Sequence, residues 1–308
     1  MSNLIIVPFA FKDGANTGVN IRHKQSSLDI YLKNCCIALI SARLNNAIDT
    51  DCALVTNIRI PQKYAAILNK NGIKVIKQEF DCFNFGDNYR WSLAFYKLCA
   101  LYRIVRSTEY ESYAYLDSDV IVQSSFDDIW TECAEKILMY NLNEKLGDEE
   151  YNHIFNEATP LLKSCDFIHY GGEFFAASKE NAIKFSSISL SVYNEMVKKK
   201  VATSHGDEFI ISLAAQSFVN DIADTGIYVC RIWTGTYRSI PPYYFSSVVL
   251  HMPAEKEYGI IRLFNKYISK GKALPDKEKL YSICHINTPS ILTLLKIFVK
   301  RILKLRVR

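Results

Sequence analysis

Apolar residues occur in short blocks along the first quarter of the chain. Residues 4–9 and 52–56 are near-continuous apolar runs, and residues 72–76 form a third, shorter one. Runs of this length that are rich in Leu, Ile and Val are typical of strands buried on both faces of a sheet. Between them, residues 26–44 and 61–69 show helical spacing, and the second segment begins with a proline, a common first helical residue. The pattern predicts strands that alternate with helices.

Strand–helix–strand order predicts a mostly parallel central sheet with helices on both faces, which is the Rossmann-like α/β class. Ligands of such sheets bind at the carboxyl ends of the strands. The glycine-rich fingerprints of dinucleotide-binding and P-loop enzymes are missing from the first turn, which disfavours both classes. We expect a loop over residues 12–20 and a charged, mostly helical excursion over residues 132–163.

Composition is that of an ordinary globular enzyme and adds few constraints. The 308 residues are 49% hydrophobic and 22% charged, enough for one large domain or two small ones. The N-terminus reads as a first strand rather than an export signal. No apolar run reaches the ~18 residues of a membrane-spanning helix. Nine cysteines, without a C-x-x-C pair, favour reduced thiols in a cytoplasmic protein, and their spacings disfavour a zinc site.

The most informative stretch is the apolar run at residues 113–122, which Asp117 and Asp119 interrupt. In extended backbone this spacing sends both carboxylates to the same face. Two like charges in an apolar setting push one pKa up unless a cation lies between them. Mg²⁺ and Mn²⁺ prefer oxygen ligands and are commonly held by one or two carboxylates together with substrate phosphates. The motif therefore favours a nucleotide-diphosphate site, although the same spacing also occurs in solvated turns at strand ends.

Two further segments place polar or small residues in apolar surroundings. Lys97 lies on an apolar helix over residues 95–102, where it either reaches the surface or contacts a ligand. Gly171 and Gly172 precede an apolar strand, where they either form a turn or let the backbone approach a ligand closely.

Two later segments have the same double interpretation. Asp207 and Glu208 open an apolar helix, either as favourable N-terminal acids or as ligand-binding groups. His251 ends a late strand, a structural position unless the imidazole faces a metal.

The order of these segments resembles that of the retaining, glycogenin-like glycosyltransferases with the GT-A fold, of the bacterial cell-surface glycan type. Members of this family have a helix with a lysine, a strand ending in DxD, an N-[SA]-G turn, a D-Q pair opening a helix, and a strand ending H-x-x-G-x-x-K. The corresponding residues here are Lys97, Asp117-Ser118-Asp119, Gly171-Gly172-Glu173, Asp207-Glu208 and His251 to Lys256. The resemblance spans residues 4–256. The chain departs from the pattern at Gly171, Glu208 and Ala254, and Lys256 comes one residue early.

This resemblance implies a metal-dependent glycosyltransferase that uses a nucleotide-sugar donor, a UDP-sugar in the first instance, and a glycan or glycolipid acceptor, with retention of configuration. Asp117, Asp119 and His251 would hold a divalent metal, Mn²⁺ or Mg²⁺. Asp207, Glu208 and Glu173 would form the catalytic set around the transferred sugar. The donor would contact Phe9, Lys97, Asp117, Ser118, Asp119, Gly171, Gly172 and Lys256.

The net charge of +5 conceals an asymmetry at the C-terminus. Residues 290–308 contain six basic residues and no acidic one, so the rest of the chain is close to neutral. Apolar residues recur there at steps of three and four, which predicts an amphipathic basic helix. Such a helix either packs on the body, lies on an anionic membrane or contacts another partner. We favour the interpretation that the helix lies on the inner, cytoplasmic face of the cell membrane. We expect no nucleic-acid partner.

The sequence thus predicts a GT-A-like catalytic domain over residues 1–256, a helical extension over 257–289 and a basic tail over 290–308. Two other functions remain open at this point. One is a nucleotidyltransferase on a related α/β fold, which would release pyrophosphate. The other is a non-catalytic module that binds a membrane surface and carries a degenerate site.

Overall fold

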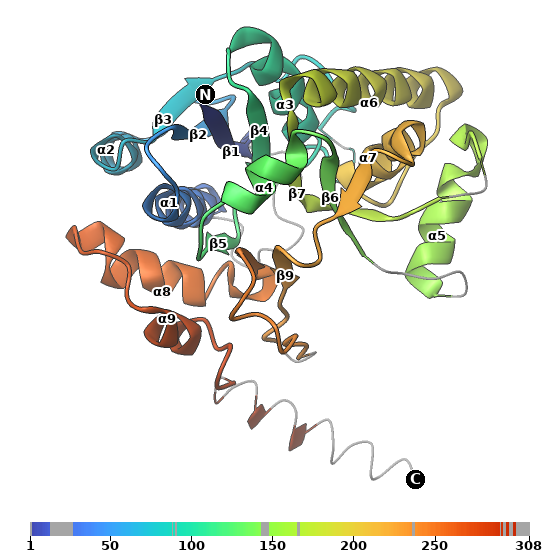
Figure 1. Ribbon diagram of the computed structural model, residues 1–308. Helices are drawn as coiled ribbons and strands as arrows, with labels where there is room; N and C mark the ends of the chain where they lie inside the picture. Colours follow the sequence, from blue (N-terminus) through green and yellow to red (C-terminus); the bar gives the residue numbers. More distant parts are fainter. Residues whose placement is uncertain are drawn as a thin grey trace.

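The computed structural model is an α/β structure built around a large, mostly parallel sheet (Figure 1). The sheet has flanking helices on both faces, as the alternating sequence pattern predicts. The structure describes residues 2–12, 27–87, 89, 91–142, 148–164, 167–235, 238–289, 291, 294, 295, 298 and 299.

Among the described residues, the large sheet has seven strands in the order β3-β2-β1-β4-β7-β6-β8. Their bounds are β1 (Asn3–Phe9), β2 (Thr50–Thr56), β3 (Lys74–Lys77), β4 (Ser112–Leu116), β6 (Ile137–Asn141), β7 (Tyr170–Ser178) and β8 (Ile222–Asp224). Neighbouring strands are parallel, except that β7 runs antiparallel to both β4 and β6. The prediction of a mostly parallel sheet is therefore confirmed.

The two faces of the sheet carry two separate hydrophobic cores, and β1 contributes to both. Leu4 and Ile6 pack in the core on one face, whereas Ile5 and Val7 pack in the core on the other. Side chains of a strand alternate between faces, so a strand covered on both sides needs an unbroken apolar run. This requirement explains why the first apolar block of the sequence shows no alternation.

Helices from different parts of the chain cover the two faces. One core includes residues of α3 (Tyr96–Ser107), α5 (Glu149–Ala158), α6 (Lys179–Lys199) and α7 (Asp207–Ala215). The other includes residues of α1 (Ser27–Asn45), α2 (Gln62–Lys70), α4 (Asp127–Cys133), α8 (Gly259–Lys266) and α9 (Lys277–Ile283). The predicted helices at residues 26–44 and 61–69 correspond to α1 and α2.

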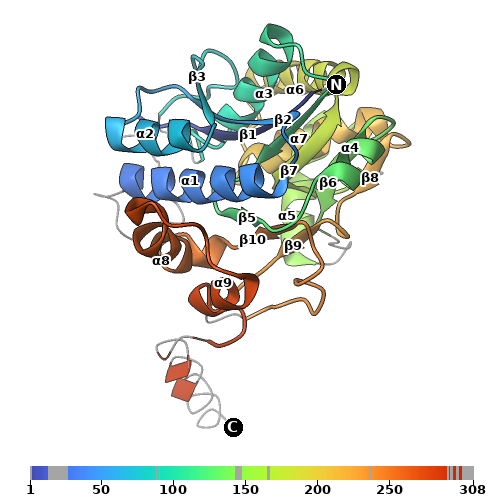
Figure 2. The same cartoon turned by 60° about the vertical axis from the view of Figure 1, so that its left-hand side comes forward.

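A small sheet lies beside α1 and completes the second core. Its strands, in the order β5-β10-β9, are β5 (Val120–Val122), β10 (Val249–His251) and β9 (Val229–Arg231). Figure 2 shows α1 between the large sheet and a layer formed by α8 and the small sheet, and α1 contacts both α8 and β5. This position explains why α1 is buried on most of its surface.

Two predictions from the sequence are corrected by the structure. Residues 113–122 do not form one extended strand, because β4 and β5 belong to different sheets and a turn at residues 117–119 joins them. Residues 132–163 are not mostly helical, because β6 lies among them and pairs with β7 and β8. Its short apolar run is flanked by charged helices that hide the strand signal.

The predicted loop at residues 12–20 and the predicted tail helix lie largely outside the described residues. Of the tail, Ile291, Leu294, Leu295, Phe298 and Val299 are described as helical, with 49% to 79% of each residue exposed. In the part of the chain that the structure describes, no helix is long and apolar enough to cross a membrane.

Candidate functional site

The turn at residues 117–119 joins the large sheet to the small one and is held from both sides. The Asp117 N–H donates a hydrogen bond to the Glu173 carbonyl of β7 at 3.0 Å. The Met252 N–H, just after β10, donates to the Asp119 carbonyl at 2.9 Å. Both carboxylates therefore have fixed positions even though the backbone between them is turned rather than extended.

Two lysines contact these carboxylates. Lys97 Nζ, at the start of α3, lies 2.6 Å from Asp117 Oδ1 and 2.9 Å from Asp207 Oδ2, and it donates to the Gly172 carbonyl. Lys256 Nζ lies 3.1 Å from Asp119 Oδ2. Each lysine is only 8% exposed, so neither is a solvated surface cation.

His251 faces both carboxylates because β10 pairs antiparallel with β5, which places His251 opposite Val120. Its Nε2 lies 3.8 Å from Asp117 Oδ2 and 3.7 Å from Asp119 Oδ2. Its Nδ1 lies 3.3 Å from Glu173 Oε1, so an N–H donated there leaves the Nε2 lone pair directed at the two aspartates.

This arrangement fits a divalent metal. One ligand atom from each of Asp117, Asp119 and His251 lies within 4.8 Å of the other two. Two carboxylates with one imidazole form a mixed oxygen and nitrogen donor set, which suits Mn²⁺ among the first-row divalent ions. The Glu173 contact supplies the outer carboxylate that metal-binding histidines usually have.

Burial and charge together set the protonation states around this group. Burial alone would raise the pKa of Asp119, but Lys256 and His251 outweigh it and hold that pKa well below its ordinary value. Burial alone would lower the pKa of His251, but Asp119 and Glu173 raise it to about 9. Without a metal, the imidazolium is therefore a cation of the site, and a metal at Nε2 would replace its proton.

The two acids at the start of α7 differ in their environments. The N-cap residue of α7 is Gly206, and the Asp207 side chain contacts Lys97 instead of capping the helix. Burial raises the pKa of Asp207 to about 7, with Lys97 opposing and Asp117 adding to the effect. For Glu208, burial is outweighed by His169 and Arg231, which lower its pKa to about 2. At neutral pH Glu208 is ionised, whereas Asp207 is partly protonated.

Arg231 is a site residue that the sequence analysis missed. Its Nε lies 3.6 Å from Glu173 Oε1, and it stands beside His251 in the pairing of β9 with β10. Arg231 raises the positive charge behind His251 and, against the effect of burial, helps to lower the pKa of Glu173. The available signal in the sequence was that Arg231 places a positive charge at the end of a short apolar strand.

A cavity of about 330 Å³ opens in front of these charges. Most of the residues predicted from the sequence line it: Phe9, Lys97, Asp117, Ser118, Asp119, Gly172, Asp207, Glu208, His251 and Lys256. Among the described residues, Gly171 and Glu173 are outside this wall, and Glu173 contacts His251 from behind. Four aromatic residues that were not predicted also line the cavity, namely Phe11, Tyr31, Trp91 and Trp233.

Among comparisons with known proteins, only the solved structures support the fold. No protein-family model matches the chain, and no curated protein matches its sequence. Solved structures do match, among them mouse xyloside xylosyltransferase 1 in its apo form, with a TM-score of 0.51 and 13% sequence identity. That match covers 82% of this chain and 97% of the mouse chain. The chain thus has the fold of a glycosyltransferase, while the glycogenin-like type stays a prediction.

Gly172 offers a test of the close packing at this site. A Cβ atom there would lie 2.4 Å from Asp207 Oδ2 and 3.0 Å from Lys97 Nζ. We expect Gly172→Ala to lower the free energy of unfolding by about 1–3 kcal/mol, because an added methyl group must displace the Lys97–Asp207 pair. Denaturant titration of the metal-free protein measures this difference.

The matched control is Gly235→Ala, whose Cβ would meet its nearest neighbour at 3.9 Å. This variant should change the free energy of unfolding by less than about 0.5 kcal/mol. Equal stability of the two variants would contradict the close approach of Gly172 to Asp207.

Proposed function

We propose that the protein is a metal-dependent glycosyltransferase. It would move a sugar from a nucleotide-diphosphate sugar, a UDP-sugar in the first instance, to a cell-surface glycan or lipid-linked acceptor. The observation that carries the proposal is the convergence of Asp117, Asp119 and His251 on a cavity that Lys97 and Lys256 also line. The glycosyltransferase fold supports the same reaction class.

The cavity suits a nucleotide diphosphate in both size and charge. Its volume of about 330 Å³ is within the usual range of ligand sites, and it adjoins residues 8–11 at the carboxyl end of β1. Asp117, Asp119 and His251 would hold Mn²⁺ or Mg²⁺ there. When bound, the metal would offset the negative charge that develops on the leaving diphosphate. Lys97 and Lys256 would supply further positive charge at fixed positions.

The transfer breaks the bond between the anomeric carbon and the diphosphate oxygen. A new bond forms from that carbon to an acceptor hydroxyl oxygen, whose proton is released, and the nucleoside diphosphate departs. Asp207 would bind donor-sugar hydroxyls or stabilise the positive charge on the sugar ring in the transition state, with Glu208 next to it in the cavity wall. Glu173 would act from outside the wall, through its contact with His251. Retention of the anomeric configuration, which the family resemblance implies, belongs to this proposal.

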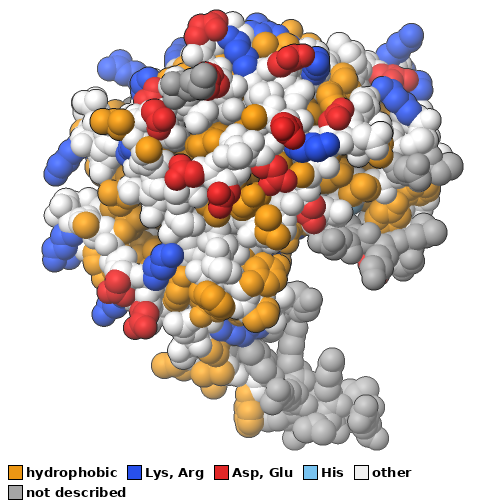
Figure 3. All heavy atoms as spheres, in the orientation of Figure 1, with side chains coloured by type: hydrophobic (Ala, Val, Ile, Leu, Met, Phe, Trp, Pro, Cys, Tyr) orange, Lys and Arg blue, Asp and Glu red, His pale blue; other side chains and the backbone are white. Residues whose placement is uncertain are grey.

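We also propose that the tail at residues 290–308 attaches the protein to the anionic inner face of the cell membrane. The described apolar side chains of this segment are exposed, and hydrophobic side chains gather on the lower part of the face shown in Figure 3, where the segment leaves the body. Six basic residues in the same stretch would contribute roughly 1 kcal/mol each beside an anionic leaflet. The division into residues 1–256, 257–289 and 290–308 stays a prediction.

The metal site predicts the effect of one substitution. Asp119→Asn removes a charged metal ligand, so we expect at least a ~100-fold loss of turnover with the fold retained. A screen of nucleotide sugars for manganese-dependent hydrolysis measures it, with UDP as the expected product. The exposed Asp128→Asn serves as the control and should keep full activity.

Wild-type turnover in Asp119→Asn would contradict the assignment of Asp119 as a metal ligand. Release of pyrophosphate from a nucleoside triphosphate and a sugar 1-phosphate, with no UDP released from nucleotide sugars, would favour a nucleotidyltransferase.

A second prediction separates the sugar site from the nucleotide site. Asp207→Asn should reduce kcat at least ~100-fold yet leave the affinity for UDP with manganese nearly unchanged, because Asp207 acts on the sugar. Donor hydrolysis and calorimetric titration with UDP give the two quantities. Glu208→Gln, which installs the amide of the family pattern, should keep far more turnover than Asp207→Asn. Equal losses of kcat and UDP affinity in Asp207→Asn would move this residue into the nucleotide site.

The tail makes a third prediction. A chain that ends at residue 289 should stay folded, act on a soluble acceptor mimic, and lose binding to vesicles that contain phosphatidylserine. High salt should weaken attachment of the full chain without abolishing it, because screening removes the Coulomb attraction but not the apolar burial. Neutral phosphatidylcholine vesicles are the control. If the shortened chain unfolds, the segment belongs to the core and the membrane proposal fails.

A further inference from the structure

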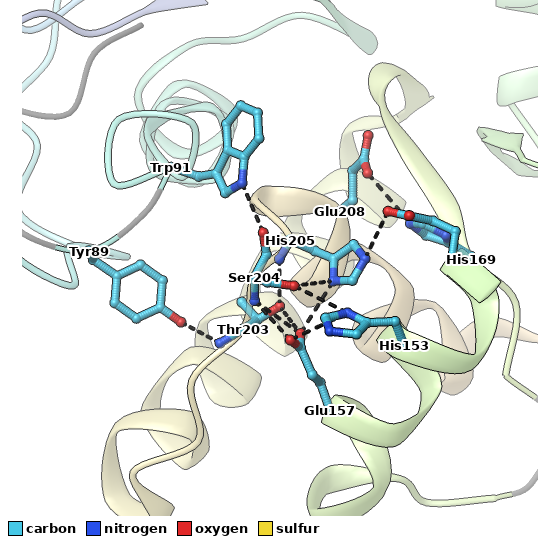
Figure 4. Close-up of polar contacts among 10 residues, drawn as sticks. Tyr89, Trp91, His153, Glu157, His169, Thr203, Ser204, His205 and Glu208 are labelled. Carbon is cyan, nitrogen blue, oxygen red and sulfur yellow. Dashed lines mark hydrogen bonds and ion pairs between the residues drawn. The ribbon is translucent and has the colours of Figure 1, made fainter. Parts of the chain in front are cut away.

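A second group of metal-ligand side chains lies between α5 and the loop that leads into α7 (Figure 4). His153 and Glu157 stand four residues apart on α5 and so share a face of that helix. His205 lies two residues before α7. One ligand atom from each residue lies within 4.8 Å of the other two. Within the described part of the chain, none of this histidine cluster (His153, Glu157 and His205) belongs to the wall of the 330 Å³ cavity.

The spacing within the histidine cluster is close to that of a tetrahedral metal site. His205 Nδ1 lies 3.2 Å from Glu157 Oε2, and His153 Nδ1 lies 3.7 Å from Glu157 Oε1. Ligands ~2.0–2.1 Å from zinc in a tetrahedron are ~3.4 Å apart, so both histidine–glutamate distances are close to tetrahedral spacing. The Ser204 hydroxyl oxygen lies 3.3 Å from His153 Nδ1 and 3.4 Å from His205 Nδ1. The Nδ1 atoms of both rings therefore face the Ser204 hydroxyl, between the two histidines.

The surroundings hold the ligands in place. His205 Nε2 lies 3.3 Å from Glu150 Oε1, so an N–H donated to that carboxylate leaves Nδ1 as the ligand atom. The Thr203 hydroxyl donates to Glu157 Oε2 at 2.6 Å, and the Ser204 N–H donates to the same carboxylate at 3.1 Å. Burial alone would raise the pKa of Glu157, but these hydrogen bonds lower it, so the carboxylate is ionised.

We propose that His153, Glu157 and His205 bind a transition-metal dication of the zinc class, with water as the fourth ligand. Two imidazoles and one carboxylate make a set that prefers Zn²⁺, Cu²⁺ or Ni²⁺ to Mg²⁺ or Mn²⁺. The site around Asp117 and Asp119 has the opposite preference, because oxygen dominates its ligands. His153 is exposed, which leaves the fourth position open to solvent.

Occupation of this site would join α5 to the start of α7. The loop that carries His205 continues directly into Asp207 and Glu208. The His205 ring also packs edge-on against the His169 ring at 5.7 Å, and His169 Nε2 lies 3.5 Å from Glu208 Oε2. The metal is therefore a structural link that fixes the loop before α7, and the proposal does not depend on glycosyl transfer.

A third group with metal-ligand spacing consists of Asp81, Cys82 and Cys99. An experiment on the histidine cluster must distinguish metal binding there from metal binding at this group. Arg103 forms an ion pair with Asp81, which reduces the attraction of that group for a cation. The Cys82 and Cys99 sulfurs lie 3.1 Å apart, so the group still has two thiols to offer zinc. The test is therefore made in a Cys82→Ser background.

The experiment uses the full chain, stripped of metal with a chelator and titrated with Co²⁺. We expect one Co²⁺ per chain to give the intense visible absorption of tetrahedral coordination and to be displaced by Zn²⁺, in addition to any Co²⁺ that Asp117, Asp119 and His251 bind. His153→Ala should weaken this binding at least ~10-fold and remove the rise in melting temperature that Zn²⁺ causes. Glu149→Ala, an exposed acid on the same helix, and Asp119→Asn should both retain the spectrum.

The substituted side chain of His153 is exposed, so the variant should fold, and circular dichroism checks this. Equal Co²⁺ affinity in His153→Ala and its parent would overturn the proposal. So would tetrahedral binding in the wild-type chain that disappears in the Cys82→Ser background, because the thiol group would then be the site.

Discussion

The arrangement of the site depends on one constraint, which is that several carboxylates are buried together and each must be balanced by a cation. Asp117 contacts Lys97, and Asp119 contacts Lys256. Protonated His251 lies close to both aspartates. A buried charge without a partner costs several kcal/mol, roughly 3–5 when one member of a pair is removed. The protein can hold this much negative charge at the cavity only because the cations come with it.

Each of these charged residues comes from a different part of the fold. The packing of helices and strands must therefore bring the carboxylates and cations together. Lys97 stands on α3, His251 ends β10, and Asp207 opens α7. The buried Asn34 of α1 donates through its Nδ2 to the Lys256 carbonyl at 2.9 Å, which ties that segment to the second core. The large and small sheets meet at the turn of residues 117–119. The cavity forms there because strands of both sheets end in polar residues at this turn.

The sequence predicted the local parts of this arrangement and could not predict the others. The apolar blocks identified the first strands. The DxD motif, with the order of the later segments, identified about half of the cavity wall, including all of its charged residues except Arg231. Arg231 and the histidine cluster were missed, since they become neighbours only through strand pairing and the contact of α5 with the loop before α7. The strand β6 was missed because its few apolar residues lie between charged helices, and only pairing with β7 and β8 makes it a strand.

The same charge balance bears on the proposal that the site binds a metal and a diphosphate together. To bind a dication, His251 would give up the proton at Nε2, so one positive charge would be exchanged for two. The site would gain a net positive charge, which an incoming anion can neutralise, and this favours binding of the diphosphate after or with the metal. Lys97 and Lys256, released in part from their carboxylates by the metal, would then have donors to offer the phosphate oxygens.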